Sequence, residues 1–130
     1  MQPTSAPPMR NILVVDDSAF EQRMLMDLLS EQPYRISVAF NGLQGYQLAL
    51  ANQPDLILLD VRMPGMNGLE VLRRVREIDR EIGVIMVTAV NEEETGRQAL
   101  ALGAFDYIVK PLDLAYLEKS LWYKITTMLL

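Results

Sequence analysis

The sequence predicts a single α/β domain, built as a doubly wound, five-stranded parallel sheet with helices between its strands. Its 130 residues are about the length of one domain. With 50% hydrophobic and 22% charged residues, the chain can bury a proper core. Short apolar runs alternate with segments of helical periodicity along the chain. Continuous rather than alternating apolar runs are typical of parallel strands buried on both faces.

The strands are expected in five short segments. Residues 35–39 alternate polar and apolar side chains, which suits an edge strand. The others are mostly continuous apolar runs, typical of buried strands. The five expected strands are 12–15, 35–39, 56–59, 84–87 and 107–109.

Helices are expected between the strands and after the last one. The pair Asn41-Gly42 is a plausible start for the second helix, and Gly103 a good stop for the fourth. Asp113 is expected to cap the fifth, and Phe20 to share an apolar face of the first with Met24, Leu25 and Leu28. The expected helices are 19–31, 43–52, 69–78, 92–102 and a segment that begins after Asp113.

The ends of the chain and its charge indicate a cytoplasmic domain. Residues 1–10 contain three prolines and are expected to form a flexible leader, with the domain over 11–130. No apolar run approaches the roughly 18 residues of a membrane span, and the start lacks a secretory signal. The net charge of −5 argues against direct binding to nucleic acid.

Composition also restricts the chemistry. The chain has neither cysteine nor histidine, which excludes disulfides, thiolate metal sites and serine–histidine or cysteine–histidine catalysis. Any reaction must therefore depend on carboxylates, lysine and hydroxyl groups, with or without a hard metal ion.

Such groups stand where the expected strands end. Asp16 and Asp17 follow the first strand, Asp60 the third, Thr88 the fourth and Lys110 the fifth. Parallel strands bring these ends to one edge of the sheet, where open α/β sheets bind ligands. Clustered carboxylates repel one another, and Mg²⁺ together with a lysine would offset that repulsion. A carboxylate in this setting can attack phosphorus and form an aspartyl phosphate.

Each residue alone has an ordinary structural explanation. An aspartate after a strand is usually a turn or helix cap, and a strand-end threonine or loop lysine needs no function. The joint pattern, with Pro111 directly after the lysine, favours a functional site over coincidence.

Four segments of the chain resemble the CheY-like receiver domain of bacterial two-component response regulators. They are residues 12–17, 55–68, 84–89 and 103–111, and the resemblance extends over about residues 10–130. It implies a flavodoxin-like (βα)5 fold with strand order 2-1-3-4-5. It also implies a signalling role in a phosphorelay, in which a sensor histidine kinase or histidine phosphotransfer protein phosphorylates the domain. The domain then controls a partner or output domain that the sequence does not identify.

The resemblance assigns roles to the residues at the strand ends. Asp60 would be the phosphoacceptor. Asp17 would bind Mg²⁺ directly and Asp16 partly through water, while Asp60 and the backbone carbonyl of Arg62 would complete the protein ligands. Thr88 and Lys110 would bind the phosphoryl group.

The resemblance also implies a switch. Thr88 would report the phosphoryl group, and Tyr107 falls at the family's switch aromatic position. Pro111 would follow a cis peptide bond. The face formed by the fourth helix, the fifth strand and the fifth helix would change, and could also join two copies in a dimer. Gly96 in the fourth helix reflects either close packing or a deliberately weakened helix.

Two side chains near the site bear on the phosphoryl lifetime. The family varies the positions of Arg62 and Val90, and here neither has a carboxamide or carboxylate that could orient a water molecule. Autodephosphorylation is therefore expected to be slow.

Three other functions are weaker interpretations of the sequence. A scaffold that ignores phosphate would not need the full set of acidic residues and lysine. A phosphatase with an aspartate nucleophile usually has a second aspartate where Arg62 stands. A flavodoxin-like cofactor site needs a phosphate loop rich in serine, threonine and glycine, where this chain has Asp16-Asp17. The expected role is therefore a phosphoacceptor signalling domain, not an enzyme that turns over a separate substrate.

Overall fold

The computed structural model describes residues 10–89 and 92–128 and confirms the five-stranded α/β fold. All strand pairs are parallel, and the sheet order is β2-β1-β3-β4-β5. The strands are β1 (Asn11–Val15), β2 (Arg35–Ala39), β3 (Leu56–Asp60), β4 (Gly83–Thr88) and β5 (Asp106–Val109).

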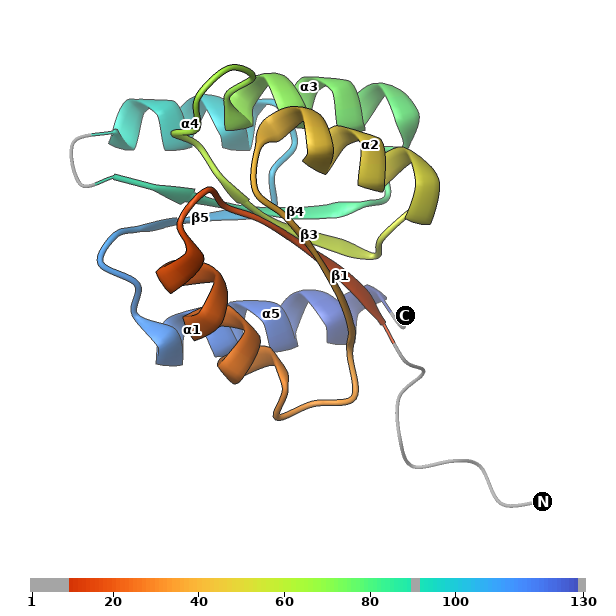
Figure 1. The fold of residues 1–130 in the computed structure, drawn as a ribbon, viewed down its shortest axis with the longest axis vertical. Coiled ribbons are helices and arrows are strands. Elements are labelled where there is room, and N and C mark those ends of the chain that lie inside the picture. The colour runs from red at the N-terminus through yellow and green to blue at the C-terminus, as the bar shows by residue number, and fades with distance from the viewer. Residues whose placement is uncertain (1–9, 90–91, 129–130) are drawn as a thin grey trace.

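The helices cover both faces of the sheet. Helices α1 and α5 lie on one face, and α2, α3 and α4 lie on the other (Figure 1). Their bounds are α1 (Ala19–Leu29), α2 (Gly42–Asn52), α3 (Gly68–Ile78), α4 (Glu93–Ala101) and α5 (Leu114–Met128). In the described part of the chain, none of these helices is long and apolar enough to cross a membrane.

The core lies in two layers, one on each face of the sheet. Every residue of β3 and β4 is buried, as their continuous apolar sequences predict. The edge strand β2 has only one buried residue, Ala39, in agreement with its alternating sequence. Burial along their whole length therefore fixes the positions of the ends of β3 and β4, where the predicted site lies.

Side-chain caps fix the starts of four helices. Ser18, Asn41, Asn67 and the predicted cap Asp113 each accept a hydrogen bond from the backbone N–H three residues later. These bonds satisfy amide groups that the first turn of a helix leaves unpaired. The predicted start of α2 at Asn41 is thereby confirmed.

The predicted apolar face of α1 is wrong at Phe20, whose side chain is 72% exposed. The buried residues of this helix are Gln22, Leu25 and Leu29. At about 100° per residue, Phe20 lies about 200° around the axis from Gln22 and so points away from the sheet. Helical periodicity favoured the more apolar Phe20, whereas the structure buries Gln22, whose side-chain amide donates to backbone carbonyl groups.

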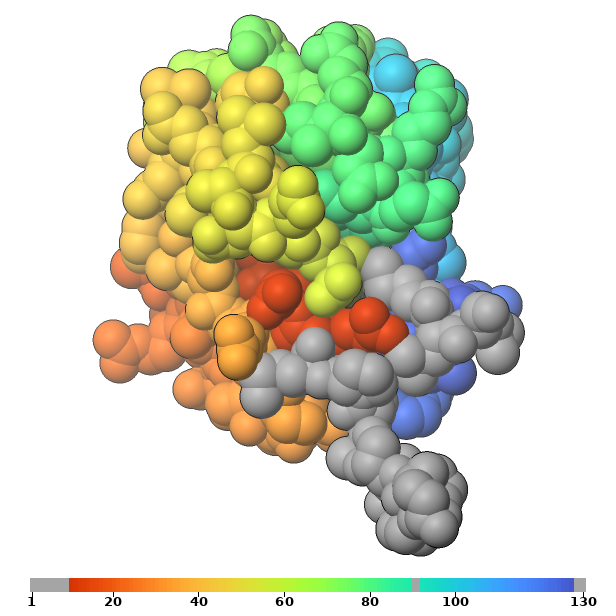
Figure 2. Space-filling view, turned by 90° about the vertical axis from the view of Figure 1, so that its right-hand side faces the viewer, coloured from red at the N-terminus to blue at the C-terminus, as the bar shows by residue number. Residues whose placement is uncertain are grey.

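The amino ends of the strands meet at the edge opposite the predicted site. Figure 2 shows this side of the molecule, with the start of β1 in red. Here Asp55 accepts a hydrogen bond from the Asn11 N–H at 2.8 Å and pairs with Arg10 at 3.8 Å. Residues 1–9 of the expected leader lie outside the described residues.

Candidate functional site

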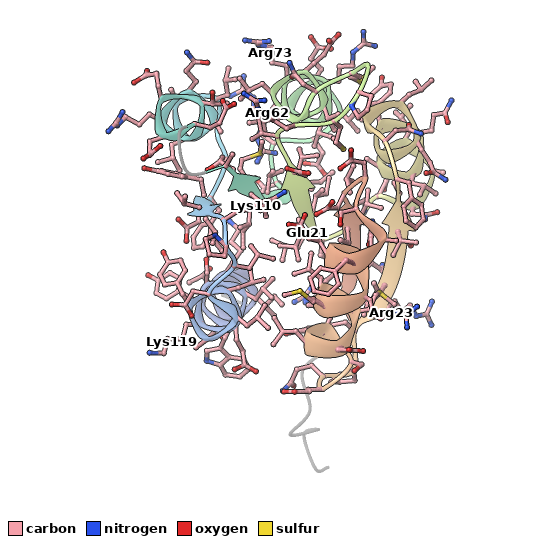
Figure 3. The ribbon with its side chains drawn as sticks, turned by 60° about the vertical axis from the view of Figure 1, so that its left-hand side comes forward. Glu21, Arg23, Arg62, Arg73, Lys110 and Lys119 are labelled. Carbon is pink, nitrogen blue, oxygen red and sulfur yellow. The ribbon has the colours of Figure 1, made fainter. Side chains whose placement is uncertain are left out.

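The predicted site residues lie at the carboxyl edge of the sheet. Asp60 and Thr88 are the last residues of β3 and β4, while Asp16 and Lys110 directly follow β1 and β5. The strand register aligns these ends, because Asp60 lies opposite Val87 of β4. Figure 3 shows Lys110 at this edge, with Glu21 of α1 beside it. The sheet therefore brings together groups that are far apart in the sequence.

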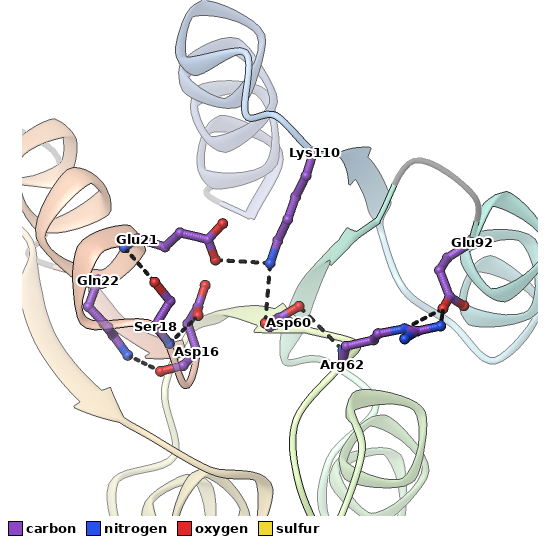
Figure 4. A network of polar contacts seen from close by, with 8 residues as sticks. All are labelled: Asp16, Ser18, Glu21, Gln22, Asp60, Arg62, Glu92 and Lys110. Atoms are coloured by element: carbon purple, nitrogen blue, oxygen red, sulfur yellow. Dashed lines mark hydrogen bonds and ion pairs between the residues drawn. The ribbon is translucent and has the colours of Figure 1, made fainter.

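Lys110 bridges two carboxylates at this edge (Figure 4). Its Nζ lies 2.9 Å from Oε1 of Glu21 and 3.4 Å from Oδ2 of Asp60. One carboxylate oxygen each from Asp16, Glu21 and Asp60 lies within 4.8 Å of the others, close enough to hold a metal ion. Asp16 and Asp60 are almost completely buried. The edge thus gathers three carboxyl groups around one ammonium group.

Sequence reasoning missed Glu21. Its position three residues after Ser18 matches the spacing of a helix capping box, so the sequence gives a local reason for an acidic residue there. Its contact with Lys110 depends on the sheet, which brings the start of α1 and the end of β5 to the same edge.

Gln22 was also missed, and it fixes the turn between β1 and α1. Its Nε2 lies 2.8 Å from the carbonyl oxygen of Ala39, 3.1 Å from that of Asp16 and 3.3 Å from that of Val14. The Asp16 carboxylate also accepts a hydrogen bond from the Ser18 N–H at 2.8 Å. The Asp16 side chain is therefore held by the backbone around it.

Burial sets the protonation of the two carboxyl groups. It raises the pKa of Asp16 to about 8, with a further increase from the hydrogen bond with Glu21. Burial also raises the pKa of Asp60, although the charge of Lys110 works in the opposite direction. Both shifts show that this edge is unfavourable for bare negative charge, which a cation would relieve.

Glu21 and Lys110 stabilise each other's charged forms. Burial alone would raise the pKa of Glu21, but its hydrogen bonds with Asp16 and Lys110 outweigh that effect and lower it. Burial would likewise lower the pKa of Lys110, but Glu21 and Asp60 outweigh it and raise it.

Two predicted residues stand apart from the carboxylate cluster. Asp17 is exposed and does not belong to the group formed by Asp16, Glu21 and Asp60. Thr88 is fully buried, and its hydroxyl oxygen has no hydrogen-bond partner in the described part of the chain. A buried hydroxyl without a partner is costly, and a phosphoryl-binding role for Thr88 stays a prediction.

Arg62 adjoins the site through its backbone and points its side chain elsewhere. Its N–H lies 3.3 Å from Oδ1 of Asp60. Its guanidinium pairs with Glu92, just before α4. Val90, the other residue expected to affect the phosphoryl lifetime, lies outside the described residues.

Tyr107 packs directly on Gly96. A β-carbon built at Gly96 would lie 2.5 Å from a carbon of the Tyr107 ring. Of the two explanations for this glycine, the structure supports close packing. The peptide bond between Lys110 and Pro111 is cis, as the resemblance implies.

Aromatic side chains remain on the outside of α5. Tyr116, Trp122 and Tyr123 are 47%, 60% and 62% exposed. The Tyr116 hydroxyl donates a hydrogen bond to Asp106 at 2.7 Å, which connects α5 to the start of β5. Dimerisation through this side of the domain stays a prediction.

The fold and the acidic edge with its lysine define a CheY-like α/β domain. The sequence matches the response regulator receiver domain family over residues 12–121. The chain belongs to this family, the receiver domains of two-component response regulators.

Known proteins of two kinds are similar to this chain. Sporulation initiation phosphotransferase F of Bacillus subtilis is 38% identical over 103 residues, which cover 79% of this chain and 83% of that protein. The regulatory protein AtoC of Escherichia coli is 41% identical over 103 residues, but they cover only 22% of its length. A crystal structure of a CheY-like receiver domain protein from Methanospirillum hungatei has a TM-score of 0.86 at 26% identity, covering 92% of this chain and 95% of that one. The match thus covers most of some relatives and only a small part of much longer ones.

Proposed function

We propose that the domain accepts a phosphoryl group on Asp60 from a sensor histidine kinase or a histidine phosphotransfer protein. A carboxylate oxygen of Asp60 attacks phosphorus, and the new P–O bond forms as the P–N bond of the phosphohistidine breaks. The electron pair of that bond leaves with the imidazole, which takes up a proton. The domain acts as a phosphoacceptor in signal transduction and, by itself, not as an enzyme on a separate substrate.

The position of Lys110 beside Asp60 is the observation that carries this proposal. Its Nζ lies 3.4 Å from the buried Asp60 carboxylate. An ammonium group at this place would neutralise charge on phosphoryl oxygens attached to Asp60. The unpartnered hydroxyl of Thr88 supplies a second donor for those oxygens.

The residues at this edge fit Mg²⁺. We propose that Asp17 binds the cation directly, Asp16 partly through water, and that Asp60 and the backbone carbonyl of Arg62 complete the protein ligands. These donors are all oxygen atoms, the type that Mg²⁺ prefers. The buried carboxyl groups with raised pKa values supply a reason for a cation to bind. When bound, Mg²⁺ would neutralise charge on the phosphoryl oxygens and on the acidic side chains.

The proposed output is a change on the face formed by α4, β5 and α5. Thr88 and Lys110 would move toward the phosphoryl oxygens, and Tyr107 would turn inward. Lys110 directly follows β5, and Tyr107 lies within it. This face would contact a downstream protein or output domain, and could pair two copies of the domain.

The proposed boundaries are a receiver domain over residues 11–130 preceded by a leader over 1–10. We propose that the domain lies in the cytoplasm, where it would contact the phosphohistidine of a sensor kinase. Neither nucleic acid nor a membrane is a proposed direct partner, since the sequence carries a net charge of −5.

The test is the intact mass of the protein after incubation with acetyl phosphate and Mg²⁺. The wild type is expected to gain one phosphoryl group, and Asp60→Asn is expected to gain none. Asp27→Asn is the matched control, because Asp27 is an exposed aspartate of α1; it should be phosphorylated like the wild type.

A phosphohistidine-bearing phosphotransfer protein serves as a second donor in the same assay. If neither donor modifies the wild type, the phosphoacceptor function is refuted and a scaffold that ignores phosphate takes its place. If Asp60→Asn is modified as fully as the wild type, the assignment of Asp60 is refuted.

A further inference from the structure

Glu21 is the nearest ionic partner of Lys110. The two side chains meet at 2.9 Å, whereas Lys110 lies 3.4 Å from Asp60. Both are largely shielded from water, with side chains 28% exposed for Lys110 and 20% for Glu21. The contact joins the start of α1 to the end of β5 across the phosphoacceptor edge (Figure 4).

The local structure of α1 frees Glu21 for this contact. Ser18 caps the helix and accepts a hydrogen bond from the Glu21 N–H at 3.2 Å. In a full capping box the glutamate would accept a bond from the Ser18 N–H in return. That N–H donates instead to Asp16 at 2.8 Å. The Glu21 carboxylate therefore reaches across the edge instead of folding back on its own helix.

A lysine side chain needs such a partner to stay in one place. Its ammonium group is carried on a flexible four-carbon stem and has three donors. The ion pair with Glu21 engages one side of the ammonium group and leaves donors for Asp60 and for phosphoryl oxygens. Glu21 can thus fix Lys110 without removing it from the reaction.

We propose that Glu21 is a positioning residue, which holds the Lys110 ammonium beside Asp60 before the phosphoryl group arrives. The inference rests on the proposed function of Asp60. Glu21 itself contacts Lys110 and does not need to touch the phosphoryl group. Without it, the ammonium would occupy its place near Asp60 for a smaller part of the time, and transfer to Asp60 would slow.

The test compares Glu21→Gln with Glu31→Gln. Glutamine keeps the length of the side chain and removes the charge, and it is also accepted at this position of a capped helix. Glu31 is exposed beyond the end of α1, so its variant loses the same charge away from the edge. Two readouts are measured: the NMR signal of the Lys110 ammonium in the protein without phosphate, and the limiting rate of phosphorylation by acetyl phosphate at saturating Mg²⁺.

The ammonium signal reports the ion pair directly, because pairing slows exchange of its protons with water. The chain has only two other lysines, Lys119 and Lys124, and Lys110→Met assigns the signal. The wild type and Glu31→Gln are expected to give a narrow Lys110 signal, which broadens in Glu21→Gln. The limiting rate is expected to fall about tenfold in Glu21→Gln, the loss of roughly one charge-assisted hydrogen bond.

A narrow Lys110 signal in Glu21→Gln would overturn the proposal. A broadened signal with a limiting rate equal to that of Glu31→Gln would overturn it as well, because the ion pair would then have no part in the transfer. If the wild type accepts no phosphoryl group at all, the proposed function of Asp60 fails, and the ammonium signal still decides whether Glu21 holds Lys110.

Discussion

Without Mg²⁺, the domain should lose stability as the pH rises from about 5 to about 8. Burial raises the pKa of Asp16 from 3.8 to about 8. The folded protein therefore keeps a proton that the unfolded chain has already released. Because the unfolded state binds fewer protons in this range, raising the pH favours unfolding. The loss begins near the unfolded pKa and ends near the folded one.

The size of the effect follows from the same shift. One proton difference changes the free energy of unfolding by about 1.4 kcal/mol per pH unit, so three units set an upper limit of about 4 kcal/mol. The slope flattens near the folded pKa, and relaxation around a buried group reduces it further. We expect a loss of about 2 kcal/mol, or roughly 8 °C in Tm for a domain of this size.

Other groups at the edge do not reverse the sign. The raised pKa of Asp60 acts in the same direction. The lowered pKa of Glu21 contributes stability above its unfolded value of 4.5, which is lost as the pH falls through the lower folded value. That contribution changes only below the pH range considered.

Urea unfolding at pH 5, 6, 7 and 8 measures the effect, with and without Mg²⁺. The variant Asp16→Asn should flatten the profile, because its amide oxygen can still accept the bond from Ser18 and carries no charge. Mg²⁺ at about 100 times its Kd should add about 2.7 kcal/mol to the wild type. A metal-free wild type whose stability stays level or increases between pH 5 and 8 would refute the reasoning.

Three further substitutions test the frame around the site. Gly68→Ala would place a β-carbon 2.4 Å from the backbone oxygen of Asp60; this should lower the free energy of unfolding by about 2 kcal/mol, and an unchanged urea midpoint would contradict it. Gln22→Leu removes the hydrogen bond to the Asp16 carbonyl and two others, so it should lower the free energy of unfolding by about 2 kcal/mol and weaken Mg²⁺ binding measured by calorimetry. A Mg²⁺ affinity equal to that of the wild type would show that Gln22 does not support the site. Asn67→Ala removes the cap of α3 and should lower the free energy of unfolding by about 1 kcal/mol; a thermal melt with the Tm of the wild type would contradict this.

Much of the fold could be predicted because the strands carry their own signal. The apolar runs that became β3 and β4 are buried along their whole length, and a continuous run is what that environment requires. The strand-end positions of Asp60, Thr88 and Lys110 followed once the sheet was taken to be parallel. Strand order came from the resemblance to receiver domains, since periodicity alone does not determine which strands are neighbours.

The contacts made by Glu21 and Gln22 could not be predicted in the same way. Helical periodicity assigns a face by hydrophobicity, and that criterion favours Phe20 over Gln22. Gln22 is buried where its side-chain amide donates to three backbone carbonyl groups near the ends of β1 and β2. The role of Glu21 depends on a lysine far away in the sequence, and it appears only when the fold brings the start of α1 and the end of β5 to the same edge of the sheet.

The contacts of α4 indicate how a change at Asp60 would reach the surface under the proposed function. Its start is held by Glu92, which pairs with Arg62 directly beyond β3. The Arg62 side chain is 71% exposed, and ion pairs in water stabilise little, so this contact is easily broken. The Tyr107 ring packs on Gly96 so closely that a β-carbon at this position would not fit. Under the proposed function, an inward turn of Tyr107 would change the surface on which Gly96 of α4 packs, and the ion pair at the start of the helix would offer little resistance to a shift of α4.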